Sequence, residues 1–417
     1  MWPFRKSPAP HVRTAAPWWL RHDGEGDAGE ALTESRRCDI AIIGAGITGA
    51  LVADALVGTG RRIVVLDKGE AGQGSTSAST ALLQYEIDTH LVDLVRRVGA
   101  DRAALAYRAC VASFALLETR FPEMLPGAGY ERRPSLYLAA EERDVDALQG
   151  EVAARRAIGI ECEWLDAAEL GRRFGLNRPG GIFSALGAQL NPLQFTRALL
   201  GACRRHGVEI FARTQVTGIE REKGVLRLRT SRGADLIADH AVVCAGYESL
   251  DLLPDTIADL NNTFACVSEP LAADDPILRL PILWESSRPY LYLRTTSDRR
   301  LIVGGEDVAF SGAVARDALL PRQAARLMRK YRALFDRDPP RIDSAWAGSF
   351  AETRDGLPLI GVAPKGDPAV SYALCYGGNG ISFALHAGDI VRAGIEGRAH
   401  ALTEVFGFER PFAEAKR

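Results

Sequence analysis

Residues 40–49 read Ile-Ala-Ile-Ile-Gly-Ala-Gly-Ile-Thr-Gly, an apolar β-branched run that leads directly into the pattern G-x-G-x-x-G. A small-residue helical pattern follows over 50–57, and a second apolar run over 62–66 ends at Asp67. Asp67 lies 18 positions after the third glycine of the pattern. A strand, a glycine turn, a helix and a second strand that ends in an acid together form the dinucleotide-binding fingerprint. The sequence therefore predicts the βαβ unit of a Rossmann-like domain.

Each residue of this turn has a physical role in the prediction. Gly44 makes the tight turn, Gly46 lets the backbone approach a pyrophosphate, and Gly49 lets helix and strand pack closely. The helix N-terminus offers free N–H groups and a partial positive charge to phosphates. Asp67 can accept hydrogen bonds from a ribose 2′-OH. The alternative is a glycine turn in an unrelated α/β protein, which the flanking strands and the acid disfavour.

Composition limits the other possibilities. The chain has 417 residues, 25% of them charged, and a formal net charge of −2, which predicts two or three globular domains and no nucleic-acid partner. No uncharged apolar stretch reaches the roughly 18 residues of a transmembrane helix. Seven cysteines and seven histidines are scattered without metal-ligand spacing, so we expect no metal site. Unpaired cysteines and a start without a signal-like apolar region predict a cytoplasmic protein.

The first 35 residues are expected to form a tail. Prolines interrupt this segment, yet it contains Trp2, Phe4, Trp18 and Trp19. These aromatic residues favour a strap whose tryptophans pack on the body of the protein. A membrane-surface contact and a lid over a site are the alternatives.

A segment rich in Gly, Ser and Thr follows Asp67 over 69–80 and leads into Ala81, Leu82 and Leu83. Taken alone, it is typical of a flexible polar loop. Directly after the predicted ribose-binding strand, its hydroxyl groups can hydrogen-bond phosphates, and its small side chains let a planar cofactor come near. This arrangement resembles the D-amino acid oxidase / glycine oxidase superfamily of flavoproteins, which includes sarcosine oxidase and γ-glutamylputrescine oxidase.

Two C-terminal blocks strengthen the resemblance. Residues 346–361 are similar to the family pattern W-x-G-x-R-P-x-T-x-D-G-x-P-x-I-G, and 376–382 read Tyr-Gly-Gly-Asn-Gly-Ile-Ser before a long apolar helical pattern. The resemblance covers roughly 38–405 and implies an α/β fold, in which a Rossmann-like FAD-binding domain is interleaved with an α+β substrate domain on a mixed sheet. The expected segments are 36–90, 185–260 and 346–405 for the FAD-binding domain, 91–184 and 261–345 for the substrate domain, and tails over 1–35 and 406–417.

The resemblance also implies which residues bind FAD. They come from the two glycine turns, the acid after the second strand, the Ser/Thr-rich segment and the strand ends near 216, 246 and 348. The expected set is Gly44, Ala45, Gly46, Ile47, Thr48, Gly49, Asp67, Lys68, Gly74, Ser75, Thr76, Ala81, Leu82, Leu83, Val216, Ala245, Gly246, Gly348, Arg354, Gly377, Gly378, Asn379, Gly380 and Ile381. For Val216 the alternative is an ordinary strand-core residue.

The candidate substrate-pocket residues are Tyr290, Arg294, Gln84, Phe350 and Tyr376. Resemblance places Tyr290 and Arg294 on the sheet that walls the pocket, whereas the alternative makes Tyr290 a core residue and Arg294 a surface or interdomain charge. A C-terminal helix that begins at the second glycine turn would face the flavin's pyrimidine edge. Preorganised N–H donors there favour reduction of the flavin.

The sequence departs from the family at four points. The arginine that binds the substrate carboxylate in amino-acid oxidases is replaced by Phe350, and a second one by Gly378. A simple amino-acid oxidase is therefore disfavoured unless Arg294 or Arg354 takes the carboxylate. The strand 301–303 lacks the oxygen-activating lysine of sarcosine oxidases, and 349–351 lack their flavin-linked cysteine. Oxygen as acceptor is thus in doubt, and FAD is expected to be non-covalent.

Three functional hypotheses remain. The first is an FAD-dependent oxidoreductase that oxidises the C–N bond of an amine or amino acid by hydride transfer to flavin N5, with O2 or a carrier such as a quinone as acceptor. The second is an FAD-dependent 2-hydroxy acid or polyol dehydrogenase. The third is a flavin-binding subunit with a degenerate substrate site, which Phe350 and Gly378 suggest. A nicotinamide dehydrogenase is less favoured, because it gives 74–83 and 377–382 no role.

Overall fold

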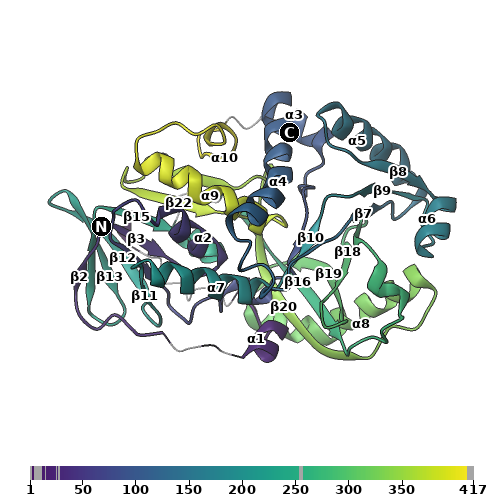
Figure 1. The fold of residues 1–417 in the computed structure, drawn as a ribbon, viewed down its shortest axis with the longest axis horizontal. Helices are drawn as coiled ribbons and strands as arrows, with labels where there is room; N and C mark the ends of the chain where they lie inside the picture. The colour runs from purple at the N-terminus through teal and green to yellow at the C-terminus, as the bar shows by residue number, and fades with distance from the viewer. Residues whose placement is uncertain are drawn as a thin grey trace.

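The computed structural model describes residues 2–3, 12–14, 16–24, 26, 29–252 and 257–410. Two halves lie side by side, each built around one large β-sheet (Figure 1). This mixed α/β architecture confirms the predicted fold class. Within the described part of the chain, no helix is long and apolar enough to cross a membrane.

The first half contains the predicted βαβ unit. Its six-stranded sheet has, in spatial order, β11 (Glu209–Phe211), β4 (Ile63–Leu66), β3 (Ile40–Ile43), β15 (His240–Val243), β22 (Val370–Leu374) and β21 (Leu359–Val362). The strands run parallel except for β21, which is antiparallel to β22. Strands β3 and β4 are buried along their whole length. Their continuous apolar sequences are typical of parallel strands covered on both faces.

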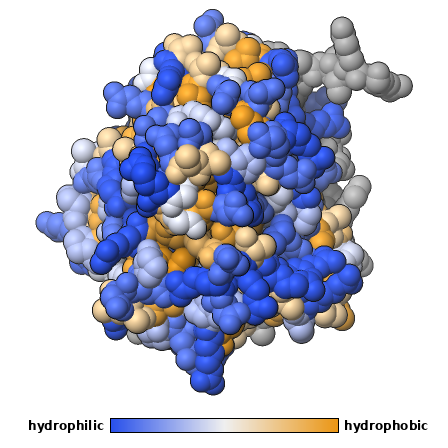
Figure 2. All heavy atoms as spheres, turned by 90° about the vertical axis from the view of Figure 1, so that its right-hand side faces the viewer, coloured by the Kyte–Doolittle hydropathy of each residue, from blue (hydrophilic) through white to orange (hydrophobic). Residues whose placement is uncertain are grey.

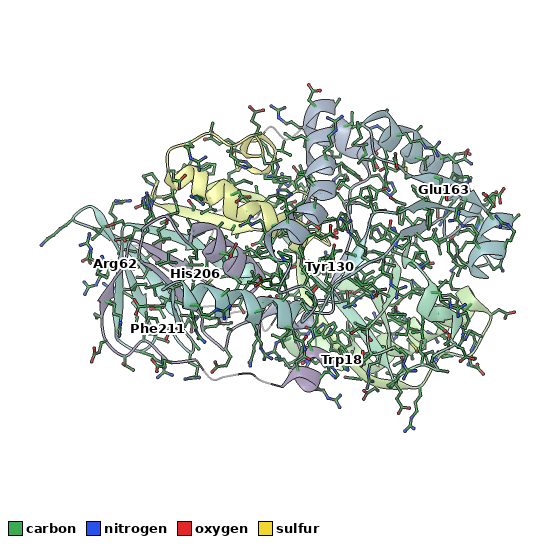
Figure 3. The ribbon with its side chains drawn as sticks, in the orientation of Figure 1. Trp18, Arg62, Tyr130, Glu163, His206 and Phe211 are labelled. Atoms are coloured by element: carbon green, nitrogen blue, oxygen red, sulfur yellow. The ribbon has the colours of Figure 1, made fainter. Side chains whose placement is uncertain are left out.

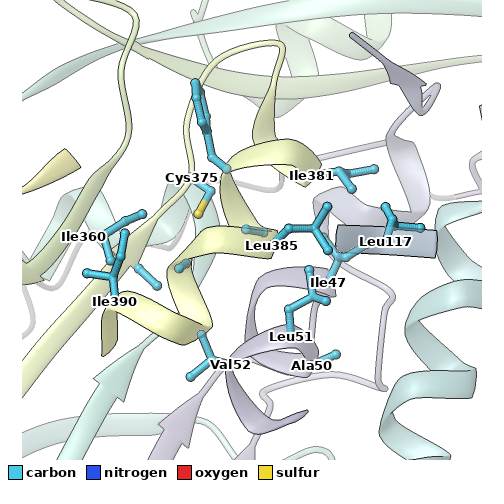
Figure 4. Packing of buried hydrophobic residues seen from close by; sticks show 14 of the residues in the cluster. Ile47, Ala50, Leu51, Val52, Leu117, Ile360, Cys375, Ile381, Leu385 and Ile390 are labelled. Carbon is cyan, nitrogen blue, oxygen red and sulfur yellow. The ribbon is translucent and has the colours of Figure 1, made fainter. Parts of the chain in front are cut away.

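Helices cover one face of this sheet. Side chains of α2 (Ile47–Leu56) and α9 (Gly380–Ile395) pack together there in the largest apolar cluster, as Figure 4 shows. The helices α7 (Pro192–Arg205), α3 (Leu91–Val98) and α4 (Ala100–Arg120) contribute to the same cluster. The sequence assigned 91–120 to the substrate domain, but α4 packs on α9 and shares this core.

A second sheet covers the opposite face. Its strands are β1 (Trp2–Pro3), β12 (Val216–Glu222), β13 (Val225–Thr230), β14 (Asp235–Ala238) and β2 (Arg36–Arg37). Leu226, Leu228 and Leu236 of this sheet are fully buried against Ala41 and Val64 of the parallel sheet. Because every second residue of β13 faces inward, this layer shows the alternation of a sheet packed on one side.

The other half is built on an eight-stranded mixed sheet. Its order is β20 (Ile342–Thr353), β16 (Ala258–Ser268), β19 (Leu301–Ala309), β18 (Leu291–Thr295), β17 (Ile282–Glu285), β7 (Ser135–Leu138), β9 (Gly180–Ser184) and β8 (Glu163–Asp166). Its helices are α5 (Val145–Ala157), α6 (Ala167–Phe174) and α8 (Ala313–Phe335), and hydrophilic side chains cover most of the outer face (Figure 2). Residues 346–353, expected in the FAD-binding domain, lie in β20 of this sheet.

A small sheet lies where the halves meet. It contains β5 (Leu82–Leu83), β10 (Ala188–Gln189) and β6 (Glu131–Arg132). The remaining helix near the C-terminus is α10 (Thr403–Phe406), which packs on α4. The residues that follow the Ser/Thr-rich segment therefore connect the nucleotide-binding half to the substrate-domain half.

The N-terminal segment is a strap across the two halves. Backbone hydrogen bonds join Val12 and Thr14 to β20 at Ala347 and Ser349. The helix α1 (Trp18–Asp23) buries Trp18 and Trp19, each only 3% exposed. Trp18 lies between the half with Phe211 and the half with Glu163 (Figure 3). This packing confirms, for Trp18 and Trp19, the prediction that the tryptophans pack on the body of the protein, whereas Phe4 and the Trp2 side chain lie outside the described residues.

Trp19 is expected to anchor the strap. Its ring packs in a cluster with Ala78 and Trp346, and its indole nitrogen donates to the Ser79 carbonyl over 2.7 Å. We expect Trp19→Ala to lower the free energy of unfolding by about 3–5 kcal/mol, because it leaves a large cavity. Trp19→Phe keeps most of the ring and should cost only about 1 kcal/mol for the lost hydrogen bond. Equal effects of the two substitutions in denaturant unfolding would contradict this role.

Candidate active site

The turn between β3 and α2 requires its glycines. Gly44 has a φ of 110°, and a Cβ there would lie 2.4 Å from the Cys244 carbonyl oxygen. A Cβ at Gly49 would lie 1.9 Å from the Gly44 carbonyl oxygen. No side chain can occupy either position without moving backbone. Because these glycines carry no side chains, a ligand can approach the N-terminus of α2, which is the arrangement that binds a pyrophosphate.

Asp67 orders this turn from the end of β4. Its carboxylate accepts hydrogen bonds from the backbone N–H groups of Ala45 at 2.7 Å and Gly69 at 2.8 Å. Burial raises the pKa of Asp67, and these two N–H groups oppose the increase. The Asp67 side chain also lines a large cavity between the two halves of the protein. It is therefore positioned to contact a ligand that lies along the turn.

The Ser/Thr-rich segment closes over the same helix N-terminus. Ser75–Ala78 form a short 3-10 helix, η1, and the Thr76 hydroxyl accepts a hydrogen bond from Ile47 N–H at 3.0 Å. This N–H belongs to the first turn of α2, where backbone donors have no partner within the helix. Thr76 therefore lies at the N-terminus of α2, where the phosphate site is expected.

A cavity of about 690 Å³ joins the two halves. Its volume falls within the roughly 300–1,000 Å³ of small-molecule and cofactor sites. It brings together most of the expected residues: Gly44, Gly46, Ile47, Thr48, Asp67, Lys68, Gly74, Ser75, Thr76, Ala81, Leu82, Leu83, Gln84, Val216, Ala245, Gly246, Tyr290, Gly348, Phe350, Gly377, Gly378, Asn379, Gly380 and Ile381. The open glycine turn, the donor-rich helix end and this elongated cavity fit FAD.

Three other expected residues do not line this cavity and act elsewhere. Ala45 and Gly49 shape the turn through their backbone, as described above. Arg354 is exposed and lines a second, outer depression, because the β20 chain turns away from the cavity after Thr353. Arg354 is therefore corrected from a candidate cofactor residue to a residue of this outer surface.

Arg294 and Tyr376 are also corrected. Arg294 is 3% exposed, and its guanidinium donates to the carbonyls of Thr80 and Leu190 at 2.6 and 2.9 Å. It also lies over the Trp19 ring, so it joins the strap to the sheet and does not reach the cavity. Tyr376 is 1% exposed and donates from its hydroxyl to Gly246 O at 3.2 Å, which makes it a core residue beneath the cavity.

The C-terminal glycine turn is fixed by the segment that follows β5. Gly378 N–H donates to the Asp88 carboxylate at 2.7 Å, and the Asn379 amide donates to the carbonyls of Gln84 and Glu86. A Cβ at Gly378 would lie 2.8 Å from an Asp88 oxygen. Where amino-acid oxidases of the family are expected to carry an arginine, this chain therefore presents a carboxylate.

Sequence reasoning missed several residues of the substrate-side wall. Arg288, Asp88, Tyr137 and Tyr292 all line the cavity. Tyr292 lies in β18 two residues after Tyr290, and alternate residues of an extended chain share one face, whereas Arg288 lies in the bend that precedes this strand. The alternation of the sequence after Tyr290 could thus have indicated Tyr292, whereas nothing in the sequence signalled Arg288, Asp88 or Tyr137.

Glu352 lies beside this wall on β20, and burial raises its pKa from 4.5 to about 7, with the Asp88 charge adding to the increase and Arg288 opposing it. The native state thus keeps a proton that the unfolded chain has lost, so this residue's contribution to stability falls as pH rises from about 4.5 to 7.

We therefore expect Glu352→Gln to gain thermal stability relative to the wild type as pH rises across this window. Melting temperatures at a series of pH values measure the difference. Glu269→Gln, which alters an exposed carboxylate just after β16, is the control. A difference between Glu352→Gln and wild type that does not change with pH would contradict the expected proton uptake.

A family model described as FAD dependent oxidoreductase matches residues 39–393. The chain belongs to this family. Among its relatives, the probable oxidoreductase OrdL of Haemophilus influenzae is 24% identical over 394 residues, which cover 91% of this chain and 88% of that protein. The γ-glutamylputrescine oxidoreductase of Escherichia coli is 24% identical over 378 residues, covering 89% and 86%.

Solved structures show the same fold. The crystal structure of glycine oxidase from Geobacillus kaustophilus superposes with a TM-score of 0.73 at 21% identity, covering 91% of this chain and all of that one. These findings confirm the resemblance to the D-amino acid oxidase superfamily. The protein is thus an FAD-dependent oxidoreductase whose relatives include enzymes named for amine and amino acid substrates.

Proposed function

We propose that this FAD-dependent oxidoreductase oxidises the C–N bond of an amine or amino acid. The observation that carries the proposal is the single cavity that joins the nucleotide-binding turn to a chamber walled by Tyr290 and Tyr292. When bound, FAD supplies the oxidising chemistry by accepting a hydride at N5. The substrate carbon loses the hydride and its nitrogen loses a proton, which gives an imine that water hydrolyses to a carbonyl compound and an amine. The names of the relatives support nitrogen-containing substrates.

The residues of the chain would position the reactants and stabilise charge. Gly377–Gly380 bring the N-terminus of α9 to the cavity, where its N–H groups can stabilise negative charge that builds up during reduction. Phe350 gives the cavity an apolar wall, and the strap lines it through Val12. Exclusion of water by these elements strengthens the electrostatic effect of the helix. No dedicated histidine base is required in this account.

We further propose that FAD is held without a covalent bond to the protein. Cys244 and Cys375 line the cavity, but both are buried, and burial raises the pKa of Cys375 to about 12. A protonated thiol is a poor nucleophile, so neither residue is suited to attack the flavin. Denaturation should therefore release FAD from the polypeptide. All seven cysteines are buried and unpaired, which supports a reducing compartment such as the cytoplasm.

The electron acceptor is proposed to be a carrier such as a quinone rather than O2. Among the described residues that line the cavity, the one lysine is Lys68, and it lies at the nucleotide end in an ion pair with Glu248. The substrate end therefore lacks an ammonium group that could activate O2 there. Faster turnover with an artificial electron-accepting dye than with air would support a carrier.

The reaction type is tested by product analysis with α-deuterated substrates. Purified enzyme, a dye acceptor and a panel of amines should give carbonyl products, and deuterium at the carbon bearing nitrogen should slow the reaction. The opposite result is turnover of 2-hydroxy acids or polyols alone, which would favour the dehydrogenase hypothesis. No turnover with either class would favour a subunit without its own substrate site.

A further inference from the structure

A second depression adjoins the substrate end of the main cavity. It encloses about 840 Å³ and is open to solvent. Asp88, His90, Tyr137 and Arg288 line both spaces, so these four side chains form the passage between them. We call this second depression the vestibule. A molecule that reaches from the cavity into the vestibule must pass Arg288.

Arg288 is placed to bind an anion in this passage. Its guanidinium lies 4.7 Å above the centre of the Tyr290 ring, which holds the planar group by a cation–π contact. Among the described residues it has neither a hydrogen bond nor an ion pair, and it is exposed to the two spaces. A guanidinium with free donors presents the two parallel N–H groups that match a carboxylate. The arginine positions used by amino-acid oxidases of the family carry Phe350 and Gly378 instead.

Two carboxylates flank the same passage. Asp88 accepts a hydrogen bond from Gly378 N–H, and Glu352 accepts one from the Asn261 amide at 3.2 Å. Both affect the pKa of Arg288 electrostatically, yet among the described residues neither forms an ion pair with it. The passage therefore presents the Arg288 guanidinium, the Asp88 carboxylate and the Glu352 carboxyl group, with unused hydrogen-bonding capacity between them. A group that carries both charges would complement this arrangement better than a carboxylate alone.

We propose that the substrate is an extended amine whose non-reacting end is an α-amino-acid group. The reacting amine would enter the main cavity, and the zwitterionic end would remain at the vestibule. Its carboxylate would bind Arg288, and its ammonium group would lie near Asp88 and Glu352. This inference rests on the proposed oxidation of a C–N bond and adds the substrate class. It also explains why the arginines of small amino-acid oxidases are dispensable here.

The test measures flavin reduction by four amines under anaerobic conditions. Hexylamine has no charged end, ε-aminocaproate ends in a carboxylate, and lysine ends in an α-amino acid. The fourth is γ-glutamylputrescine, the longer compound in the name of the E. coli relative. We expect the flavin of the wild-type enzyme to be reduced fastest, and with the lowest half-saturating concentration, by lysine or by γ-glutamylputrescine, the two amines that carry the α-amino-acid end.

Arg288→Gln should raise the half-saturating concentration for those zwitterionic amines about 10–100-fold, the loss expected for a charged hydrogen-bond pair of about 1.5–3 kcal/mol. Hexylamine should change less than about twofold, because it makes no contact with the guanidinium. Arg279→Gln is the matched control, since Arg279 is an exposed arginine of the same chain segment that lines neither space. FAD content and melting temperature show whether each variant is folded.

Four results would overturn the inference. An equal loss for hexylamine and the zwitterionic amines would make Arg288 a structural residue. An unchanged half-saturating concentration for the zwitterionic amines in Arg288→Gln would mean that their charged end does not bind there. If the rate and the half-saturating concentration of flavin reduction did not depend on the end group of the amine, the proposed C–N oxidation would stand but the substrate class would be rejected. Absence of reduction by every amine would reject both.

Discussion

Gly49→Ala is expected to yield protein without FAD. The added methyl group would lie 1.9 Å from the Gly44 carbonyl oxygen, which is main chain and cannot rotate away. The turn must therefore shift, and with it the N–H groups at the start of α2 that would hold the pyrophosphate. The measurement is the ratio of bound flavin to protein after purification.

Gly171→Ala provides the matched control for Gly49→Ala. Gly171 lies within α6, and a Cβ there meets no atom within 4 Å. Alanine at a compatible helical position should stabilise the protein slightly, by about 0.5–1 kcal/mol, and should leave FAD content unchanged. Wild-type flavin content in Gly49→Ala would show that the turn tolerates a side chain and would contradict the assignment.

Arg155→Met is expected to cause a large loss of stability. Arg155 is fully buried beside the cavity and contacts Glu151 at 2.9 Å, Tyr85 at 3.1 Å and Glu86 at 3.6 Å. Removal of one partner from a buried ion pair leaves an uncompensated charge and costs about 3–5 kcal/mol. Denaturant unfolding at neutral pH measures this loss.

The pH dependence of Arg155→Met follows from Glu151. Burial alone would raise the pKa of Glu151, but Arg155 and the backbone N–H groups of Val92 and Leu91 hold it below its usual value. The ion pair thus stabilises the wild type above the unfolded pKa and loses its effect as pH falls. The difference in the free energy of unfolding between the wild type and Arg155→Met should therefore become smaller at acid pH. Arg156→Met, at the exposed neighbouring residue, should cost below about 1 kcal/mol.

Much of the nucleotide-binding half could be predicted from local sequence. The apolar runs before Gly44 and Asp67 are long, β-branched and buried on both faces, so local pattern and tertiary environment agree. The helix α7 is encoded locally as well, since Asn191 caps it and Pro192 occupies its first turn. In these regions the residues that determine the backbone conformation are neighbours in the sequence.

The substrate side was less predictable because it depends on contacts between distant segments. Arg294 and Arg288 look equivalent in the sequence, yet Arg294 is covered by the strap through Trp19, and Arg288 faces the passage. Asp88 becomes a site residue because Gly378, far along the chain, donates to it. The placement of 346–353 in the eight-stranded sheet likewise depends on pairing between β20 and β16. Periodicity within one segment carries no information about such pairings.

We propose that this FAD-dependent oxidoreductase takes electrons from a carbon bonded to nitrogen. Anaerobic stopped-flow bleaching of the visible flavin band, with amines, N-methyl amino acids, D-amino acids and hydroxy acids as separate reductants, tests it most directly. Under this proposal we expect rapid bleaching by at least one nitrogen-containing class and none by hydroxy acids. Bleaching by hydroxy acids alone, or by no compound while FAD is bound, would contradict it.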